Sequence, residues 1–135
     1  MPSMPGKARK KLLDRAAMAR RRAYAPYSGY HVGAALLAEN GEIFSGCNVE
    51  NASYGLTICA ERAAVSRAVA EGCRRFRAIA IVSPSDPPAA PCGACRQVLA
   101  EFAEDMDVIL GDAEGNETAQ MTLKDLLPFR FGPPR

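Results

Sequence analysis

Two short segments, Cys59-Ala60-Glu61 and Pro91-Cys92-Gly93-Ala94-Cys95-Arg96, organise the rest of this chain. Cys92 and Cys95 form a C-x-x-C pair, and Cys59 offers a third thiolate. Zinc held by three protein ligands keeps its fourth tetrahedral position for water, whereas a structural zinc site is closed by four ligands. The pattern therefore predicts a catalytic zinc site in which Glu61 serves as acid and base rather than as a ligand.

Both segments are expected at junctions between a strand, a loop and a helix. The apolar run 78–82 predicts a short strand, the Pro-rich stretch 83–91 a loop, and Gly93 to about Glu104 a helix. A second helix is predicted from Thr57, as its cap, to about Glu71, with Gly72 closing it. Thiolates at the start of a helix are stabilised by the positive end of its dipole and by free N–H donors.

The N-terminal part of the chain predicts a helix followed by a β-hairpin. Apolar positions recur among basic ones from Lys7 to about Arg22, which is typical of an amphipathic helix. The apolar run 32–38 and the stretch 42–47 read as strands joined at Asn40-Gly41, a strong hairpin signal. The polar loop 48–55 follows the second strand, where substrate contacts are to be expected.

The C-terminal part predicts a short strand at 108–110, a turn at 111–116 and another strand that ends near Gln120 and Met121. Thr122 should cap a short helix over 123–127, which Pro128 stops. Strands alternate with helices along the chain, so the sequence predicts the α/β class, a sheet covered by helices.

The length of 135 residues predicts one domain, at 7–135, preceded by a flexible tail at 1–6. A net charge of +2 gives no indication of nucleic-acid binding, and the basic run 7–11 reads as a solvated helix face. No signal peptide is recognisable, and no run approaches the roughly 20 apolar residues of a membrane span. Five cysteines without an export signal favour reduced thiols and a cytoplasmic protein.

The proposed chemistry requires a cation near the sulfurs. Zinc lowers the pKa of bound water to roughly neutral, but three thiolates leave the site with a net charge of about minus one. Arg62 is the first candidate to hydrogen-bond the sulfurs, and Arg96 is the second. Glu61 would take a proton from the water and deliver it to the substrate, which favours a raised pKa.

A structural zinc site or a redox pair are the simpler readings of a C-x-x-C motif. A structural site needs a fourth ligand, for which Cys47, Cys73 and His31 are available. Cys47 and Cys73 read as small buried or inert residues, and His31 lies far from the motif in the sequence. The joint occurrence of C-A-E and P-C-G-A-C-R favours the catalytic interpretation.

The chain as a whole resembles the small cytidine deaminases, whose zinc pattern is a ligand two residues before a Glu and then P-C-x-x-C. The shared blocks are Tyr24-Ala25-Pro26-Tyr27-Ser28, Val32-Gly33-Ala34-Ala35-Leu36, Gly46-Cys47-Asn48-Val49-Glu50-Asn51-Ala52, Cys59-Ala60-Glu61-Arg62, Pro91-Cys92-Gly93-Ala94-Cys95-Arg96-Gln97, Leu126-Leu127-Pro128 and Phe131-Gly132-Pro133. The resemblance implies a three-layer α/β/α sandwich around a mixed sheet of about five strands. It also implies hydrolysis of cytidine and 2′-deoxycytidine to uridine and 2′-deoxyuridine with release of ammonia, as in pyrimidine salvage. One zinc ion per subunit and a homotetramer with shared active sites are implied as well.

The resemblance also assigns roles to substrate-binding residues, all of which are expectations at this point. Asn48 and Glu50 look like the pair that holds the ribose hydroxyls, and the backbone of Ala60 like the contact to the base. Tyr30 stands where relatives often carry Phe as a wall for the nucleoside. The remaining expected contacts, some of them from a neighbouring subunit, are Ala52, Tyr54 and Phe131.

Three other functions compete with this one. A deaminase of the same fold acting on another aminopyrimidine compound, such as blasticidin S, shares the zinc motif but not the pattern Asn48-Val49-Glu50. A nucleic-acid editing deaminase needs basic surface that this chain has little of. A zinc-stabilised binding module without catalysis has no use for Glu61, so replacement of that residue would be silent.

Overall fold

The computed structural model describes residues 4–132. Its elements follow the order helix, hairpin, helix, strand, helix, hairpin, helix. In chain order they are α1 (Gly6–Arg20), β1 (Gly33–Ala38), β2 (Ile43–Cys47), the 3-10 turn η1 (Tyr54–Leu56), α2 (Ala60–Ala70), β3 (Phe76–Val82), α3 (Gly93–Phe102), β4 (Asp107–Gly111), β5 (Glu117–Thr122) and α4 (Leu123–Leu126).

The strands form one mixed five-stranded sheet in the order β2-β1-β3-β4-β5. Only β3 and β4 run parallel, and the other neighbouring pairs are antiparallel. The predicted hairpin between β1 and β2 is present, and Gly41 takes a positive φ of 92° in its turn. The α/β class and the sheet of about five strands are confirmed.

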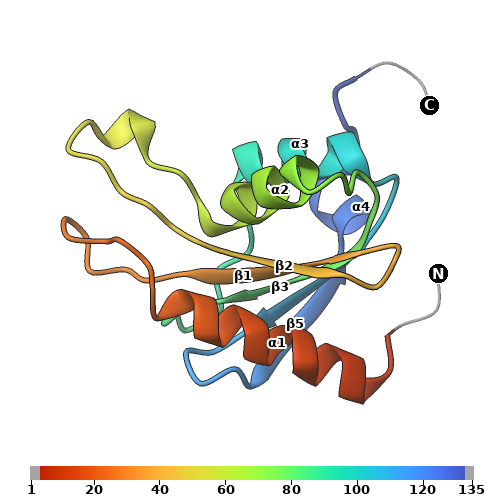
Figure 1. Ribbon diagram of the computed structural model, residues 1–135, viewed down its shortest axis with the longest axis horizontal. Coiled ribbons are helices and arrows are strands. Elements are labelled where there is room, and N and C mark those ends of the chain that lie inside the picture. The colour runs from red at the N-terminus through yellow and green to blue at the C-terminus, as the bar shows by residue number, and fades with distance from the viewer. Residues whose placement is uncertain (1–3, 133–135) are drawn as a thin grey trace.

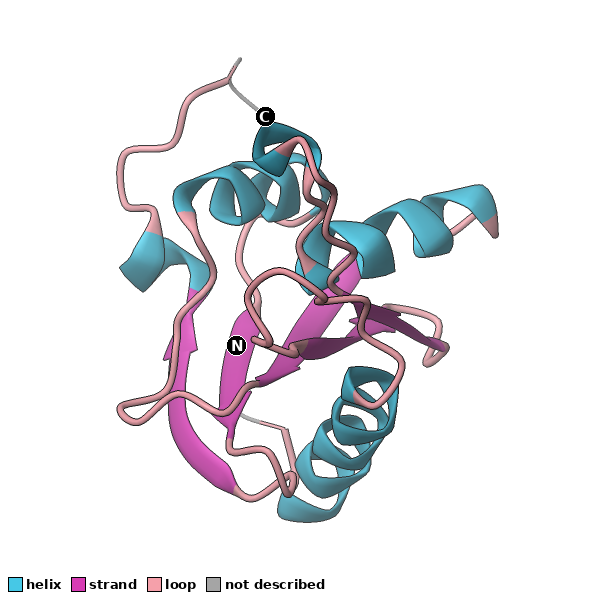
Figure 2. Cartoon of the chain, turned by 90° about the vertical axis from the view of Figure 1, so that its left-hand side faces the viewer, coloured by secondary structure: helices cyan, strands magenta, loops and turns pink. Residues whose placement is uncertain are grey.

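Helices cover both faces of the sheet, which gives the expected three layers (Figures 1 and 2). One face packs on α1 through an apolar cluster that includes Leu12, Leu13, Val82 and Ile109. The opposite face packs on α2 and α3 through a larger cluster that includes Leu99 and other buried side chains of both helices. The helices whose starts carry the cysteines therefore lie in one layer, and a closely packed apolar cluster separates them from the sheet.

Glycines let two helices approach the sheet closely. A Cβ added to Gly46 of β2 would lie 2.5 Å from the backbone N of Ala64 in α2. A Cβ on Gly33 of β1 would lie 2.0 Å from the backbone O of Ala16 in α1. Each helix thus rests on the sheet at a point that admits no side chain.

Several predicted boundaries were wrong. The helix expected from Thr57 begins at Ala60, because Val49 and Ile58 exchange two backbone hydrogen bonds of 2.9 Å that keep the chain extended up to Cys59. Within the predicted flexible tail at 1–6, Met4 is buried and Gly6 is the first residue of α1. Residues 1–3 of that tail lie outside the described range.

The predicted cap of the last helix is confirmed. Thr122 accepts from the backbone N of Asp125 and the Asp125 carboxylate accepts from the backbone N of Thr122, a capping box. Between residues 4 and 132, no helix has the length and apolar character needed to cross a membrane.

Candidate active site

The predicted metal ligands meet where α2 and α3 begin. Cys59 is the residue that precedes α2, Cys92 precedes α3, and Cys95 lies in the first turn of α3. The Sγ of Cys92 lies 4.0 Å from that of Cys59 and 3.4 Å from that of Cys95, and all three lie within 4.8 Å of one another. Tetrahedral zinc with bonds of about 2.3 Å places its sulfurs about 3.8 Å apart, so this arrangement fits a zinc ion.

A fourth ligand of the kind that closes a structural zinc site is missing from the described part of the chain. The only group of at least three His, Cys, Asp or Glu side chains close enough to share an ion there is the three-cysteine cluster. Cys73, one of the alternatives, lies instead by the β1–β2 hairpin, 3.5 Å from Nδ2 of Asn40. The geometry therefore favours an open, three-ligand site.

Glu61 is buried beside this cluster in the first turn of α2, with an exposed fraction of 5%. Its burial raises the pKa of its carboxyl, as a group that carries protons near neutral pH requires. A cavity of about 270 Å³ brings Glu61 and two of the cysteines together with four of the residues predicted to bind substrate, Tyr30, Asn48, Glu50 and Ala60. Its lining consists of Ser28, Tyr30, Val32, Asn48, Glu50, Thr57, Cys59, Ala60, Glu61, Ile81, Ser83, Ala89, Ala90 and Cys92.

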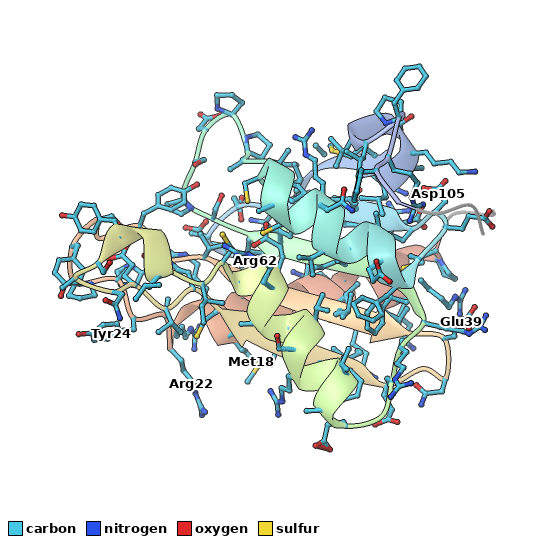
Figure 3. The ribbon with its side chains drawn as sticks, turned by 90° about the horizontal axis from the view of Figure 1, so that it is seen from above. Met18, Arg22, Tyr24, Glu39, Arg62 and Asp105 are labelled. Atoms are coloured by element: carbon cyan, nitrogen blue, oxygen red, sulfur yellow. The ribbon has the colours of Figure 1, made fainter. Side chains whose placement is uncertain are left out.

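A guanidinium lies against the sulfurs, at the junction of α2 and α3 (Figure 3). Arg62 donates from Nη2 to the Sγ of Cys59 at 3.3 Å, and its buried Nε has no partner among the described residues. The hydrogen bond between Cys95 and Cys59, together with the Arg62 cation, lowers the pKa of Cys59 to about 5. Arg96, the second candidate, instead donates to the backbone O of Pro91 and of Leu126, at 2.7 and 2.9 Å.

Asn48 and Glu50 line the cavity and are held by the backbone around it. Asn48 Oδ1 accepts from the backbone N of Val32 at 2.9 Å, and its Nδ2 donates to the backbone O of Tyr30 at 2.8 Å. The Glu50 carboxylate accepts from the hydroxyl of Ser28 and from the backbone N of Tyr27 and of Ser28. The Ser28 hydroxyl is the largest of the effects that lower the pKa of Glu50, so its charge is well supported.

The remaining predicted contacts divide into two groups. Ala60 is buried and lines the cavity, so its backbone is close to the bound substrate's expected position. Ala52, Tyr54 and Phe131 do not line it. Tyr54 is 73% exposed and packs edge-on against Tyr27 with ring centroids 5.9 Å apart, and Phe131 is 85% exposed.

Sequence reasoning missed the part of the wall formed by residues 83–90. Ser83, Ala89 and Ala90 line the cavity although none of them carries a strong chemical signal. Their position did hold a clue, because the loop 83–91 leads directly into the metal ligand Cys92. The hydroxyl of Ser28 was missed as well, since a serine in a Pro-Gly turn reads as a solvated residue.

The chain matches proteins of known family along most of its length. Residues 7–111 match the model for the "cytidine and deoxycytidylate deaminase zinc-binding region". A cytidine deaminase of Sporosarcina psychrophila is 49% identical over 122 residues, covering 90% of this chain and 89% of the relative. The crystal structure of a cytidine deaminase from Burkholderia pseudomallei has a TM-score of 0.85 at 48% identity, covering 95% of this chain and all of that one.

A more distant match agrees with these. The crystal structure of the cytidine deaminase of Mycobacterium tuberculosis superposes with a TM-score of 0.76 at 41% identity, over 91% of this chain and 96% of that one. Sequence, fold and the three-cysteine cluster thus point in one direction. The chain belongs to the cytidine and deoxycytidylate deaminase family, which binds zinc.

Proposed function

We propose that this protein catalyses the hydrolytic deamination of cytidine and 2′-deoxycytidine, giving uridine or 2′-deoxyuridine and ammonia. The observation that carries the proposal is a cluster of three thiol ligands at one small cavity, which two of them line together with a buried carboxyl. The named relatives are cytidine deaminases that span nearly the whole chain. A cavity of about 270 Å³ suits a small molecule, and no groove for a polynucleotide is needed.

The chain's own residues account for the proton transfers. Cys59, Cys92 and Cys95 would hold the zinc ion, which when bound would lower the pKa of a water and so provide the nucleophile near neutral pH. Glu61 accepts the proton of that water and passes it to the ring nitrogen of the base, then assists the departure of ammonia. Its raised pKa permits both steps, because the carboxyl can hold a proton between them.

The polar groups opposite the metal are assigned to the sugar and the base. Glu50 keeps its charge through donors from the 27–28 turn, and the carboxylate retains acceptor capacity for a ribose hydroxyl. Asn48 is fixed on both polar atoms by the 30–32 backbone, so it presents a rigid amide to the sugar. The backbone of Ala60 is assigned to the edge of the base, and the ring of Tyr30 to its wall.

The predicted homotetramer with shared sites belongs to this proposal. Tyr54 and Phe131, which do not reach the cavity of their own chain, are assigned to the site of a neighbouring subunit. The segment 48–58 projects from the body of the molecule (Figure 1). It carries the exposed apolar side chains Val49, Tyr54, Leu56 and Ile58. Exposed apolar groups gathered on one projection support contact with another chain.

The single domain at 7–135 and the cytoplasmic location also remain proposals. One continuous sheet through the described residues supports the first. The second is supported by the chemistry of the site, because three thiol ligands persist best in a compartment that keeps cysteines reduced.

The first experiment is an ultraviolet assay of zinc-loaded protein with cytidine, 2′-deoxycytidine, cytosine and blasticidin S, beside Glu61→Ala. We expect the wild type to turn over both nucleosides. Glu61→Ala should retain its zinc and lose at least about 100-fold of this activity. Turnover of blasticidin S alone would favour instead a deaminase that acts on another aminopyrimidine compound. No turnover by zinc-loaded protein would favour a binding module.

Shared sites are tested by mixing two inactive variants. Phe131→Ala lacks the aromatic side chain that we assign to the active site of a neighbouring subunit. Glu61→Ala lacks the proton carrier of its own active site. If sites are completed across subunits, mixed assemblies pair an intact Glu61 with an intact Phe131 and recover activity. Sedimentation of the wild type should show four chains. No recovery together with a monomeric mass would overturn the shared-site proposal and leave the deaminase proposal standing.

A further inference from the structure

We propose that Tyr30 and Ser85 form a clasp that holds the 84–90 segment closed over the cavity and thereby sets the affinity for the nucleoside. The Tyr30 hydroxyl and the Ser85 hydroxyl are hydrogen-bonded, and Tyr30 lines the cavity together with Ala89 and Ala90 of the segment. Both side chains are half-buried, which shields the bond from competing water. The effect on affinity rests on the proposed deaminase function, whereas the closure of the segment does not.

The 84–90 segment has little else to hold it. Apart from the Ser85 hydroxyl, no group in it is hydrogen-bonded to the remainder of residues 4–132. Its prolines, Pro84, Pro87 and Pro88, lack an N–H donor, so the segment cannot be held by a backbone ladder. The clasp is therefore the hydrogen bond that opening the segment must break.

The position of this segment makes its closure relevant to the site. Ala89 and Ala90 line the cavity, and the metal ligand Cys92 follows almost at once. A wall that is already ordered spares the substrate the cost of ordering it on binding. Loss of the clasp should thus weaken substrate binding first, and the chemical step at Glu61 less.

Tyr30 is well placed to anchor the clasp, because its own backbone is fixed on both sides. Its backbone N donates to the Ser28 hydroxyl at 3.0 Å, and its backbone O accepts from Asn48 Nδ2 at 2.8 Å. The Ser28 hydroxyl in turn donates to Glu50. One hydrogen-bond network therefore joins the groups assigned to the sugar to the 84–90 segment. Tyr30→Phe would remove the hydroxyl that connects this network to Ser85.

The test compares Ser85→Ala, Tyr30→Phe and the double variant with the wild type, all zinc-loaded. Tyr24→Phe is the matched control, because Tyr24 is exposed and its hydroxyl has no partner among the described groups. Cleavage of the 84–90 segment by elastase, which cuts after small residues such as Ala89, is measured together with KM and kcat for cytidine. We expect faster cleavage in both single variants, KM raised about 2- to 10-fold, a smaller change in kcat and unchanged zinc content.

The double variant decides whether the two residues act as one unit. If they do, it should match either single variant rather than combine their effects. Wild-type cleavage rates and KM in both single variants, or effects that multiply in the double variant, would overturn the clasp. An inactive wild type would instead overturn the proposed function, and the cleavage rates would still decide whether the clasp closes the segment.

Discussion

Arg62 reaches back along the first turn of α2 and donates from Nη2 to the Sγ of Cys59 at 3.3 Å. Three thiolates give a bound zinc ion an excess of negative charge, which reduces its ability to activate water. The guanidinium offsets that excess at the sulfur it touches, without occupying a position on the metal. Ligand and partner lie on one short helical segment, so their relative positions are fixed locally.

Removing the Arg62 cation should therefore damage the site without unfolding the protein. We expect Arg62→Gln to lower kcat/KM or zinc affinity by about 10- to 100-fold. Arg62→Lys keeps the positive charge and should show a smaller decrease. Arg67→Gln is the control, because Arg67 lies on the same helix but donates to the backbone and side chain of Ser45. Wild-type kcat/KM and zinc content in Arg62→Gln would contradict this role.

The buried ligand should matter for folding as well as for chemistry. Cys95 is fully buried, so Cys95→Ala is expected to lose most of the zinc and to lower the melting temperature. Cys73→Ala, at the hairpin far from the cluster, should retain the zinc content and nearly all of the stability. Metal analysis and thermal unfolding with and without a chelator measure both. A chelator that leaves the wild-type melting temperature unchanged would show that bound metal adds nothing to stability.

Two glycine substitutions should separate general destabilisation from damage to the site. Gly46→Ala pushes on α2, which carries Glu61, and Gly33→Ala pushes on α1, which carries none of the site. Overpacking of this kind costs about 1–3 kcal/mol, so both variants should unfold at lower denaturant concentration. Only Gly46→Ala should also lose activity at a temperature where both are folded. Gly6→Ala, with open space around its Cβ, is the control.

The turn between β4 and β5 should give a pH-dependent contribution to stability. The Asp112 carboxylate accepts from the backbone N of Asn116 and of Glu114, and the Asn116 contacts are the main cause of its lowered pKa. The pKa of Asp112 is lower in the folded state than in the unfolded state. Its ionised carboxylate therefore stabilises the fold at pH values above its pKa in the unfolded chain. This stabilisation is lost as the pH falls through its pKa in the folded protein. The stability difference between wild type and Asp112→Asn should thus be greatest near neutral pH.

The same difference should shrink below about pH 4, where Asp in the unfolded chain becomes protonated. Urea unfolding at several pH values measures it, and taking the difference between two proteins cancels the loss of zinc in acid. Glu71→Gln, which removes an equal charge from an exposed side chain, is the charge-matched control. A difference that is constant from pH 7 to 3 would contradict the assignment.

The sequence alone located the metal cluster, because its information is local. Cys92 and Cys95 are separated by two residues at the start of α3, and Arg62 follows Cys59 on one helical turn, so a short segment fixes each pair. The hairpin at Asn40-Gly41 and the cap at Thr122 were likewise set by neighbouring residues. Such short-range patterns can be recognised in the sequence, because local backbone geometry positions the groups with little contribution from the rest of the fold.

Contacts between distant segments were decided by the tertiary structure. Thr57 reads as a helix cap, yet pairing of Ile58 with Val49 keeps the chain extended and gives that position to Cys59. Tyr30 and Ser85 are 55 residues apart, and only the sheet, by placing the ends of β1 and β3 side by side, brings their hydroxyls together. The sequence by itself determined which groups are candidates for the chemistry, since short motifs place each of them at the start of a helix. The packing of α2 and the sheet decided which groups enclose them, because that depends on pairing between segments with no shared local signal.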